Sequence, residues 1–421
     1  MLTRRSLCVV PLALAGCSTA AGDRGERFAF DNGVGHRMGG PSLLRFQSID
    51  GRFPRATRAN WWQTLYSVDS YSRLDEIFPA AVSKAPSEPS PLLRAPRELP
   101  VAYEGSAVIG PGRFDLDGYM DRNPATGLLI LRDGEILAER YQYGRHERHR
   151  LTSFSMAKTV IAVLFGIAVA DGKIANIEQS ADTIVPELAG TEYGATPLRY
   201  LLTMSSGVAF REDYDGADDS AKLTQLTLGE QSAGGYLVPP HFNRRISAAG
   251  SRWYYASAET YVLALVLRRC IGKPIAQYFS ERIWQPIGAE ADATWLVDRS
   301  GQEVGFMGLN ATLRDYGRLA LMLAQGGLAQ GRQIVPRAWL GEMTHAHFQG
   351  LQTGRWFGYG FQTWIFPEGD GSFALLGVRG QASYIDPARK LAVVHTAVRP
   401  DARDRGGADL VELWRGIKRA A

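Results

Sequence analysis

One apolar segment, residues 152–173 ("TSFSMAKTVIAVLFGIAVADGK"), constrains the fold more than any other part of the chain. It has the length of a helix, and from Val160 to Val169 it carries no polar side chain on any face. A helix that is apolar all round is stable in water only when other elements surround it. A chain of 421 residues can supply those elements, so we expect this helix at the centre of a large layered domain.

Strand patterns occur on both sides of this helix in the sequence. The segments "GLLIL" and "EILAERYQY" flank Asp133-Gly134, a dipeptide typical of a tight hairpin turn. Three strand-like segments near the C-terminus read "FGYGFQTWIF", "FALLGVRGQASYID" and "KLAVVHTAV", and helical patterns fill most of the chain between. This order predicts an α+β fold, with an antiparallel sheet flanked by N- and C-terminal helices and a mainly helical inserted subdomain. We expect the functional site where the sheet and the subdomain meet.

A serine and a lysine three residues apart, Ser155 and Lys158, stand at the start of the apolar helix. The chain has only seven lysines, and this is its one Ser-x-x-Lys sequence. Residues three apart share a helix face, so the amine can reach the hydroxyl. Burial and the positive end of the helix dipole both lower the pKa of such a lysine, which would let it accept the serine proton. A capping serine followed by a lysine that reaches the surface is the structural alternative.

A tyrosine motif 100 residues later gives this pair a context, because Tyr255, Ala256 and Ser257 also precede an apolar helix. The combination resembles the β-lactamase and penicillin-binding-protein superfamily, and within it the class C β-lactamases and related esterases. The resemblance implies a serine hydrolase in which Ser155 is the nucleophile. It also implies that Lys158 and Tyr255 share the role of proton acceptor. Ser257 would orient Lys158 or pass a proton to the leaving group.

The third motif of that superfamily, Lys-Thr-Gly or His-Thr-Gly on a strand beside the site, has no literal match. The nearest segment in position and pattern is Val378, Arg379 and Gly380, followed by Gln381. This departure resembles the 6-aminohexanoate-dimer hydrolase branch, which implies small linear amides or esters as substrates in preference to β-lactams. Residues 378–381 would then form a strand that supplies one oxyanion N–H, and Ser155 would supply the other.

Three side chains are candidates for substrate contact, and each has a structural alternative. Arg379 would pair with a substrate carboxylate or lie at the surface. Tyr214, in "REDYDG", and Asn310, in "GLNATL", occupy places where relatives put substrate-contacting residues. A loop tyrosine and a helix-capping asparagine are the alternatives for these two.

The first residues have the layout of an export signal, with Arg4 and Arg5 before an apolar run and small residues before Cys17. The run from Leu14 to Cys17 resembles the bacterial lipoprotein box, which implies cleavage after residue 16 and lipidation of Cys17. The twin-arginine and general export routes both fit the basic start. We therefore divide the chain into a signal peptide (1–16), an N-terminal arm and linker (17–100) and a β-lactamase-like hydrolase domain (101–421). We expect an exported, lipid-anchored protein of the cell envelope or periplasm.

Other patterns limit the partners and leave two further functions open. A net charge of +4 spread over many arginines favours no nucleic-acid partner, and the lack of HExxH and of paired cysteines favours no metal or cofactor. The expected partner is a small amide or ester, the expected membrane contact is the lipid on Cys17 alone, and the oligomeric state is open. A D-aminopeptidase or DD-carboxypeptidase-like cell-wall enzyme is one alternative function. A catalytically silent binding lipoprotein is the other, disfavoured because Ser155, Lys158 and Tyr255 are all present.

Overall fold

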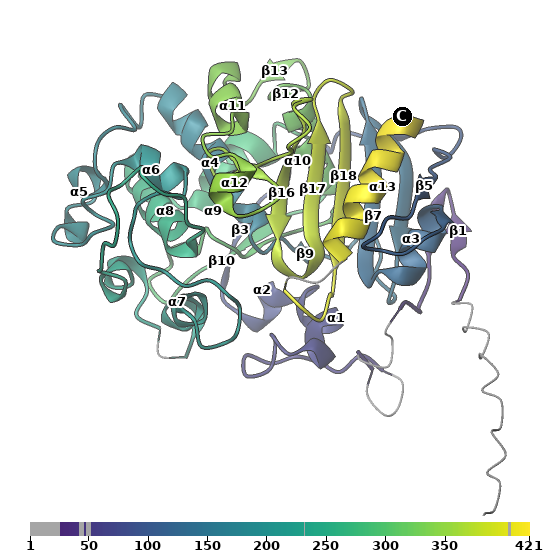
Figure 1. Ribbon diagram of the computed structural model, residues 1–421, viewed down its shortest axis with the longest axis horizontal. Coiled ribbons are helices and arrows are strands. Elements are labelled where there is room, and N and C mark those ends of the chain that lie inside the picture. Colours follow the sequence, from purple (N-terminus) through teal and green to yellow (C-terminus); the bar gives the residue numbers. More distant parts are fainter. Residues whose placement is uncertain (1–25, 42–45, 48–51, 231, 403–405) are drawn as a thin grey trace, which may run out of the picture.

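The computed structural model describes residues 26–41, 46–47, 52–230, 232–402 and 406–421, so the predicted signal peptide and Cys17 lie outside the described residues. A large sheet organises this part of the chain (Figure 1). Its strands run in the order β1-β2-β8-β7-β18-β17-β16-β15-β14, with β4 also paired to β8. Their bounds are β1 (Ala29–Asp31), β2 (Val34–His36), β4 (Leu93–Arg94), β7 (Ala125–Arg132), β8 (Glu135–Tyr141), β14 (Gly358–Tyr359), β15 (Trp364–Ile365), β16 (Phe373–Gly377), β17 (Gln381–Asp386) and β18 (Leu391–Ala397).

Most pairs in the large sheet are antiparallel, and only β2 and β4 run parallel to β8 within the described ranges. A second sheet has the order β3-β10-β11-β9. The remaining strands are β3 (Ala80–Ser83), β5 (Tyr103–Glu104), β6 (Arg113–Phe114), β9 (Leu151–Thr152), β10 (Ala293–Leu296), β11 (Leu309–Ala311), β12 (Leu328–Ala329) and β13 (Arg332–Gln333). Since β9 precedes the apolar helix directly, this second sheet fixes where that helix begins.

The hairpin of β7 and β8 shows why helices cover both faces of the large sheet. As predicted, its turn is Asp133-Gly134, and both residues have positive φ, 49° and 95°. Along β7, Leu128 and Ile130 pack in one apolar cluster, whereas Leu129 packs in another. Successive side chains of a strand point to opposite faces, so a strand that is apolar throughout needs a layer on each side.

Helices α3 (Leu116–Arg122) and α13 (Gly406–Ala420) form the layer on one face, and α4 (Met156–Ala170) and α10 (Leu313–Ala324) form the layer on the other (Figure 1). The inserted helical region lies to one side of the sheet. The helices of this region are α5 (Ala181–Ile184), α6 (Leu198–Leu202), α7 (Asp219–Leu228), α8 (Ser257–Ile271) and α9 (Ile275–Phe279). Two more helices, α11 (Arg337–Thr344) and α12 (Gly350–Thr353), follow later in the chain. Short 3₁₀ turns span Thr64–Tyr66, Pro186–Leu188, Gly235–Leu237, Pro239–His241 and Val378–Gly380, and a π-helical turn spans Ser280–Trp284. The predicted α+β architecture is confirmed.

The apolar helix α4 is the centre of the core, as its sequence predicts. Every residue from 156 to 168 is buried. At Gly166 a Cβ atom would lie 2.0 Å from the ring of Trp339, so glycine is what lets α11 pack directly on α4. The indole N–H of Trp339 donates to the carbonyl of Ala162 at 2.9 Å, which fixes this crossing.

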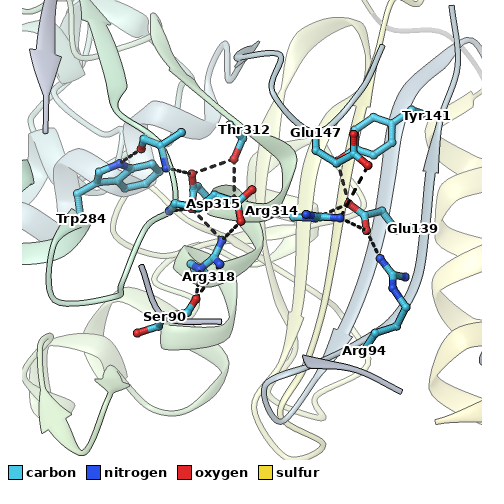
Figure 2. Close-up of polar contacts among 12 residues, drawn as sticks. Ser90, Arg94, Glu139, Tyr141, Glu147, Trp284, Thr312, Arg314, Asp315 and Arg318 are labelled. Atoms are coloured by element: carbon cyan, nitrogen blue, oxygen red, sulfur yellow. Dashed lines mark hydrogen bonds and ion pairs between the residues drawn. The ribbon is translucent and has the colours of Figure 1, made fainter. Parts of the chain in front are cut away.

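Residues 52–100 pack onto the domain through strands, two short helices and buried charges. The helices are α1 (Ser67–Ser70) and α2 (Leu74–Ile77). Figure 2 shows Arg94 and Arg314 converging on Glu139, a fully buried carboxylate of β8 that also accepts from the Tyr141 hydroxyl at 2.9 Å. Removal of one partner of a buried charge is strongly destabilising, so this network anchors the segment.

None of the helices in the described ranges is both long enough and apolar enough to span a membrane.

Candidate active site

Ser155 and Lys158 lie in contact at the start of α4. The Nζ atom of Lys158 is 2.8 Å from the Oγ atom of Ser155 and donates to the carbonyl of Phe306 at 2.9 Å. The lysine is 1% exposed, so it does not reach the surface. Burial lowers the pKa of Lys158 to about 8, against an opposing effect of the nearby Glu212 carboxylate. A lysine in this state can accept a proton near neutral pH.

The backbone just before Ser155 is strained and held by aromatic packing. Phe154 has a φ of 42°, in the left-handed region that ordinary residues avoid. Its ring lies edge-on to Tyr71 at 4.8 Å and to Trp62 at 5.6 Å between ring centroids. Such strain costs of order 1–3 kcal/mol and persists only where the surroundings hold it. The packing of Phe154 therefore fixes the orientation of Ser155 at the start of α4.

Tyr255 lies two residues before α8 and next to Ser155. Its hydroxyl interacts with the Ser155 side chain, and its ring centroid lies 5.0 Å from Nζ of Lys158. The ring stacks on Trp364 at 5.4 Å. Burial, and then the charge of Glu212, raise the pKa of Tyr255 far above its usual range. Tyr255 is therefore a neutral phenol in the resting site.

Glu212 is the site residue that the sequence reasoning missed. It is 5% exposed, and its carboxylate accepts from the backbone N–H of Ser257 at 2.7 Å and from the Ser257 hydroxyl at 2.8 Å. The hydroxyl of Tyr214 donates to it at 2.8 Å. Ser257, expected to orient Lys158 or to pass a proton to the leaving group, donates to Glu212 in this structure. The sequence signal was the loop "REDYDG", but three carboxylates compete there and only folding shows which one is buried.

The segment from Val378 to Gly380 lies at the site, but it is a turn and not the predicted strand. It links β16 to β17, and Gly377 pairs with Gln381 across it. The chain reverses because Arg379 and Gly380 both have positive φ, 60° and 92°. A Cβ on Gly377 would lie 2.4 Å from the carbonyl oxygen of Ser153, so glycine permits the close approach of this turn to the chain before Ser155.

Two predicted substrate contacts point elsewhere. The guanidinium of Arg379 lies 4.5 Å from the ring centroid of Trp62 and donates to the backbone carbonyls of Arg399 and Pro400. Asn310 is buried in β11, where its side-chain amide donates to Thr294 and to the carbonyl of Gly308. Arg379 points away from the cavities because the turn reverses the chain at this residue. Asn310 points away because it belongs to the interior of the second sheet.

Two cavities meet at Ser155, and both are also lined by Tyr214 and Val378. The larger, of about 660 Å³, is lined by aromatic side chains with several charges, among them Tyr255, Trp356, Phe357, Trp364, Tyr384, Arg355, Arg415 and Glu412. The smaller, of about 220 Å³, is lined by Trp61, Trp62, Phe154, Glu212, Phe306 and Met307, among others. No group of three His, Cys, Asp or Glu side chains in the described ranges is placed to hold a metal ion. A substrate with its reactive carbonyl at Ser155 would extend into both cavities.

Comparison with known sequences gives a consistent result. The family described as Beta-lactamase matches residues 115–413. A curated relative, the 6-aminohexanoate-dimer hydrolase of Paenarthrobacter ureafaciens, is 26% identical over 384 residues, which cover 87% of this chain and 94% of the relative.

Comparison with solved structures agrees. A Bacillus anthracis structure, provisionally named a 6-aminohexanoate-dimer hydrolase, is similar with a TM-score of 0.78 at 25% identity, over 89% of this chain and 97% of that one. A family VIII carboxylesterase has a TM-score of 0.56 at 18% identity, over 71% of this chain and 93% of that one, and so shares the fold.

Proposed function

This chain belongs to the β-lactamase family of serine hydrolases, and from that premise we propose that it cleaves an amide or ester bond of a small linear substrate through an acyl-enzyme on Ser155. The observation that carries the proposal is the 2.8 Å contact between Ser155 Oγ and the buried amine of Lys158. A buried lysine with its pKa near 8 costs stability, and base catalysis is a reason to keep it.

In the acylation step the Ser155 oxygen forms a bond to the substrate carbonyl carbon, and the serine proton passes to Lys158. The low pKa of Lys158 and the high pKa of Tyr255 favour the lysine as the base. The hydroxyl of Tyr255 holds the serine oxygen in place and can relay the proton to the leaving amine or alcohol. The bond from carbon to the leaving group then breaks, and the proton leaves with that group.

The negatively charged oxygen of the tetrahedral intermediate needs hydrogen-bond donors, and these must lie on the side away from the groups that transfer the proton. We assign this role to the backbone N–H groups of Ser155 and Val378, because both residues line both cavities. A water molecule attacks the acyl-enzyme in the second step, gives one proton to the same base and releases the acid. Ser155 regains its proton, so atoms and charge balance over the cycle.

The substrate class follows from the cavities and from the relatives. The two unequal cavities on either side of Ser155 suit an extended chain with its scissile bond near the middle, and their apolar walls suit methylene or aromatic groups. The name of the curated relative, 6-aminohexanoate-dimer hydrolase, supports a linear amide.

Acylation with a fluorophosphonate probe and mass spectrometry tests the mechanism. We expect an adduct on Ser155 that is lost in Ser155→Ala and strongly slowed in Lys158→Met. The purified protein should hydrolyse p-nitrophenyl esters or the 6-aminohexanoate dimer and leave a chromogenic cephalosporin intact. A folded protein whose Ser155 is not acylated by any of these reagents would contradict the proposal and favour a silent binding role.

We also propose export and lipid anchoring through Cys17, on the strength of the N-terminal sequence alone. In bacterial cells the wild-type chain should fractionate with membranes and release from them on detergent treatment. The Cys17→Ser variant should become soluble after export. A Cys17→Ser variant that stays with the membranes would rule out this anchor.

A further inference from the structure

The turn that carries Val378 is supported from behind by a buried histidine of β18. His395 has no solvent exposure, its Nδ1 atom lies 2.6 Å from the carbonyl oxygen of Gly380, and its Nε2 atom lies 3.0 Å from the hydroxyl of Tyr119. A carbonyl oxygen can only accept, so Nδ1 carries the proton and Nε2 accepts from the phenol. Burial lowers the pKa of His395 to about 3, so the ring stays neutral in this arrangement.

A second buried side chain holds the same turn. The amide nitrogen of Gln381 donates to the carbonyl of Ala397 at 2.8 Å and to those of Arg379 and Val378 at 3.2 and 3.3 Å. Its amide oxygen accepts from the backbone N–H of Ala397 at 3.1 Å. Gln381 therefore links the carbonyls of the turn to the neighbouring strand β18.

The turn needs such support because its own backbone is unfavourable. Arg379 has a φ of 60°, a region that a side chain with a Cβ avoids, and it precedes Gly380 at 92°. A change of these angles would rotate the peptide plane that holds the Val378 carbonyl and the Arg379 N–H, and through the backbone of Val378 it would also move the N–H of Val378. Displacement of a catalytic group by about 1 Å can cost about 100-fold in rate.

We propose that His395 and Gln381 are positioning residues that aim the backbone N–H of Val378 at the oxyanion of the tetrahedral intermediate. Both residues act through the carbonyls of the turn, and Gln381 also lines the larger cavity. The inference rests on the proposed function, since it requires acyl transfer on Ser155. It adds to that function the two side chains that make the oxyanion site rigid.

The test compares folded variants in ester hydrolysis and in binding of a boronic acid, which forms a tetrahedral anion on the serine. His395→Leu and Gln381→Met should each lower kcat about 10- to 100-fold, with KM changed less than about threefold, and should weaken boronate binding by a similar factor. His395→Asn should recover most of kcat, because its amide can donate to Gly380. Tyr119→Phe is the matched control, because it removes the hydrogen bond on the far side of the ring, and it should lower kcat less than about threefold.

The inference is wrong if folded His395→Leu and Gln381→Met retain wild-type kcat and boronate affinity. It is also wrong if their loss of activity equals the loss of protein whose Ser155 can be labelled by the fluorophosphonate, because that result would indicate a purely structural role. If His395→Leu does not fold, Gln381→Met and His395→Asn decide the question alone. A separate measurement tests the proposed function itself: if it is wrong, the fluorophosphonate does not label Ser155 in the wild-type protein.

Discussion

Replacement of Lys158 by methionine should strongly slow acylation and at the same time change the pH dependence of stability. Methionine has a similar length and no charge, so it fills the same buried space. Burial holds the pKa of Lys158 at about 8 in the folded chain, whereas an unfolded lysine has its ordinary value of 10.5. One pKa unit corresponds to about 1.4 kcal/mol, so the buried ammonium costs the folded state about 3 kcal/mol below pH 8.

The sign of the pH effect follows from proton counts. Below pH 8 both states carry the proton, so the cost is full and constant. Between pH 8 and 10.5 the unfolded state binds more protons than the folded state, so the unfolding free energy of the wild type rises with pH. With these two pKa values, the cost falls from about 3 kcal/mol at pH 7 to about 1 kcal/mol at pH 9.5.

Urea unfolding of wild type and Lys158→Met at pH 7 and pH 9.5 measures this difference. The advantage of the variant over the wild type should shrink by about 2 kcal/mol between the two pH values. The lost hydrogen bonds to Ser155 and Phe306 reduce that advantage equally at both, so they do not affect the comparison. Lys173→Met, at an exposed position, is the control and should follow the wild type.

The same ionisation should govern the rate. At pH 7 about one tenth of a lysine with a pKa of 8 is neutral, against about 0.03% at a pKa of 10.5, so burial raises the available base about 300-fold. The value of kcat/KM should therefore rise with pH along a limb centred near 8. A limb centred above 10, together with a stability difference that does not vary with pH, would refute the reasoning.

Three further substitutions test other parts of the site. Glu212→Gln removes the charge that raises the pKa of Lys158, so the rising limb of kcat/KM should move to lower pH, and an unmoved limb would show that the charge does not reach Lys158. Tyr255→Phe keeps the ring on Trp364 and removes the hydroxyl, so kcat should fall about 100- to 10,000-fold in steady-state assays while the melting temperature changes by only a few degrees. Trp62→Ala removes one wall of the 220 Å³ cavity, so in a series of p-nitrophenyl esters kcat/KM for octanoate should rise several-fold relative to butyrate, and an unchanged ratio would place the acyl chain elsewhere.

The features that the sequence predicts well are those set by local pattern. The apolar segment after Lys158 has no polar face, so a buried central helix is the one stable arrangement, and the structure contains it. The turn at Asp133-Gly134 requires two positive φ angles that these residues tolerate, and both are observed. In each case a short stretch of sequence contains the whole physical reason.

The features that the sequence does not predict depend on contacts between distant segments. Residues 373–386 read as one strand, and the reversal at Arg379 depends on hydrogen bonds from Gln381 and from His395 on the neighbouring strand. Glu212 stands in an acidic loop that looks solvated, and its burial depends on the backbone N–H of Ser257. Asn310 looks like a helix cap by spacing alone, yet its strand pairs with β9 and β10 in the interior.

The reversal at Arg379 also explains how the site can differ from Lys-Thr-Gly and keep its chemistry. An oxyanion is held by backbone N–H groups, so the requirement at this turn is the position of Val378 and not the side chain that follows it. The side chain of residue 379 is thereby released from substrate contact. In this protein it covers Trp62, which itself lines the smaller cavity beside Ser155. One arginine thus joins the turn that we propose as the oxyanion site to the segment that contains Trp62, so we expect substrate selection on that side to depend on how residues 61 and 62 pack as much as on the catalytic motifs.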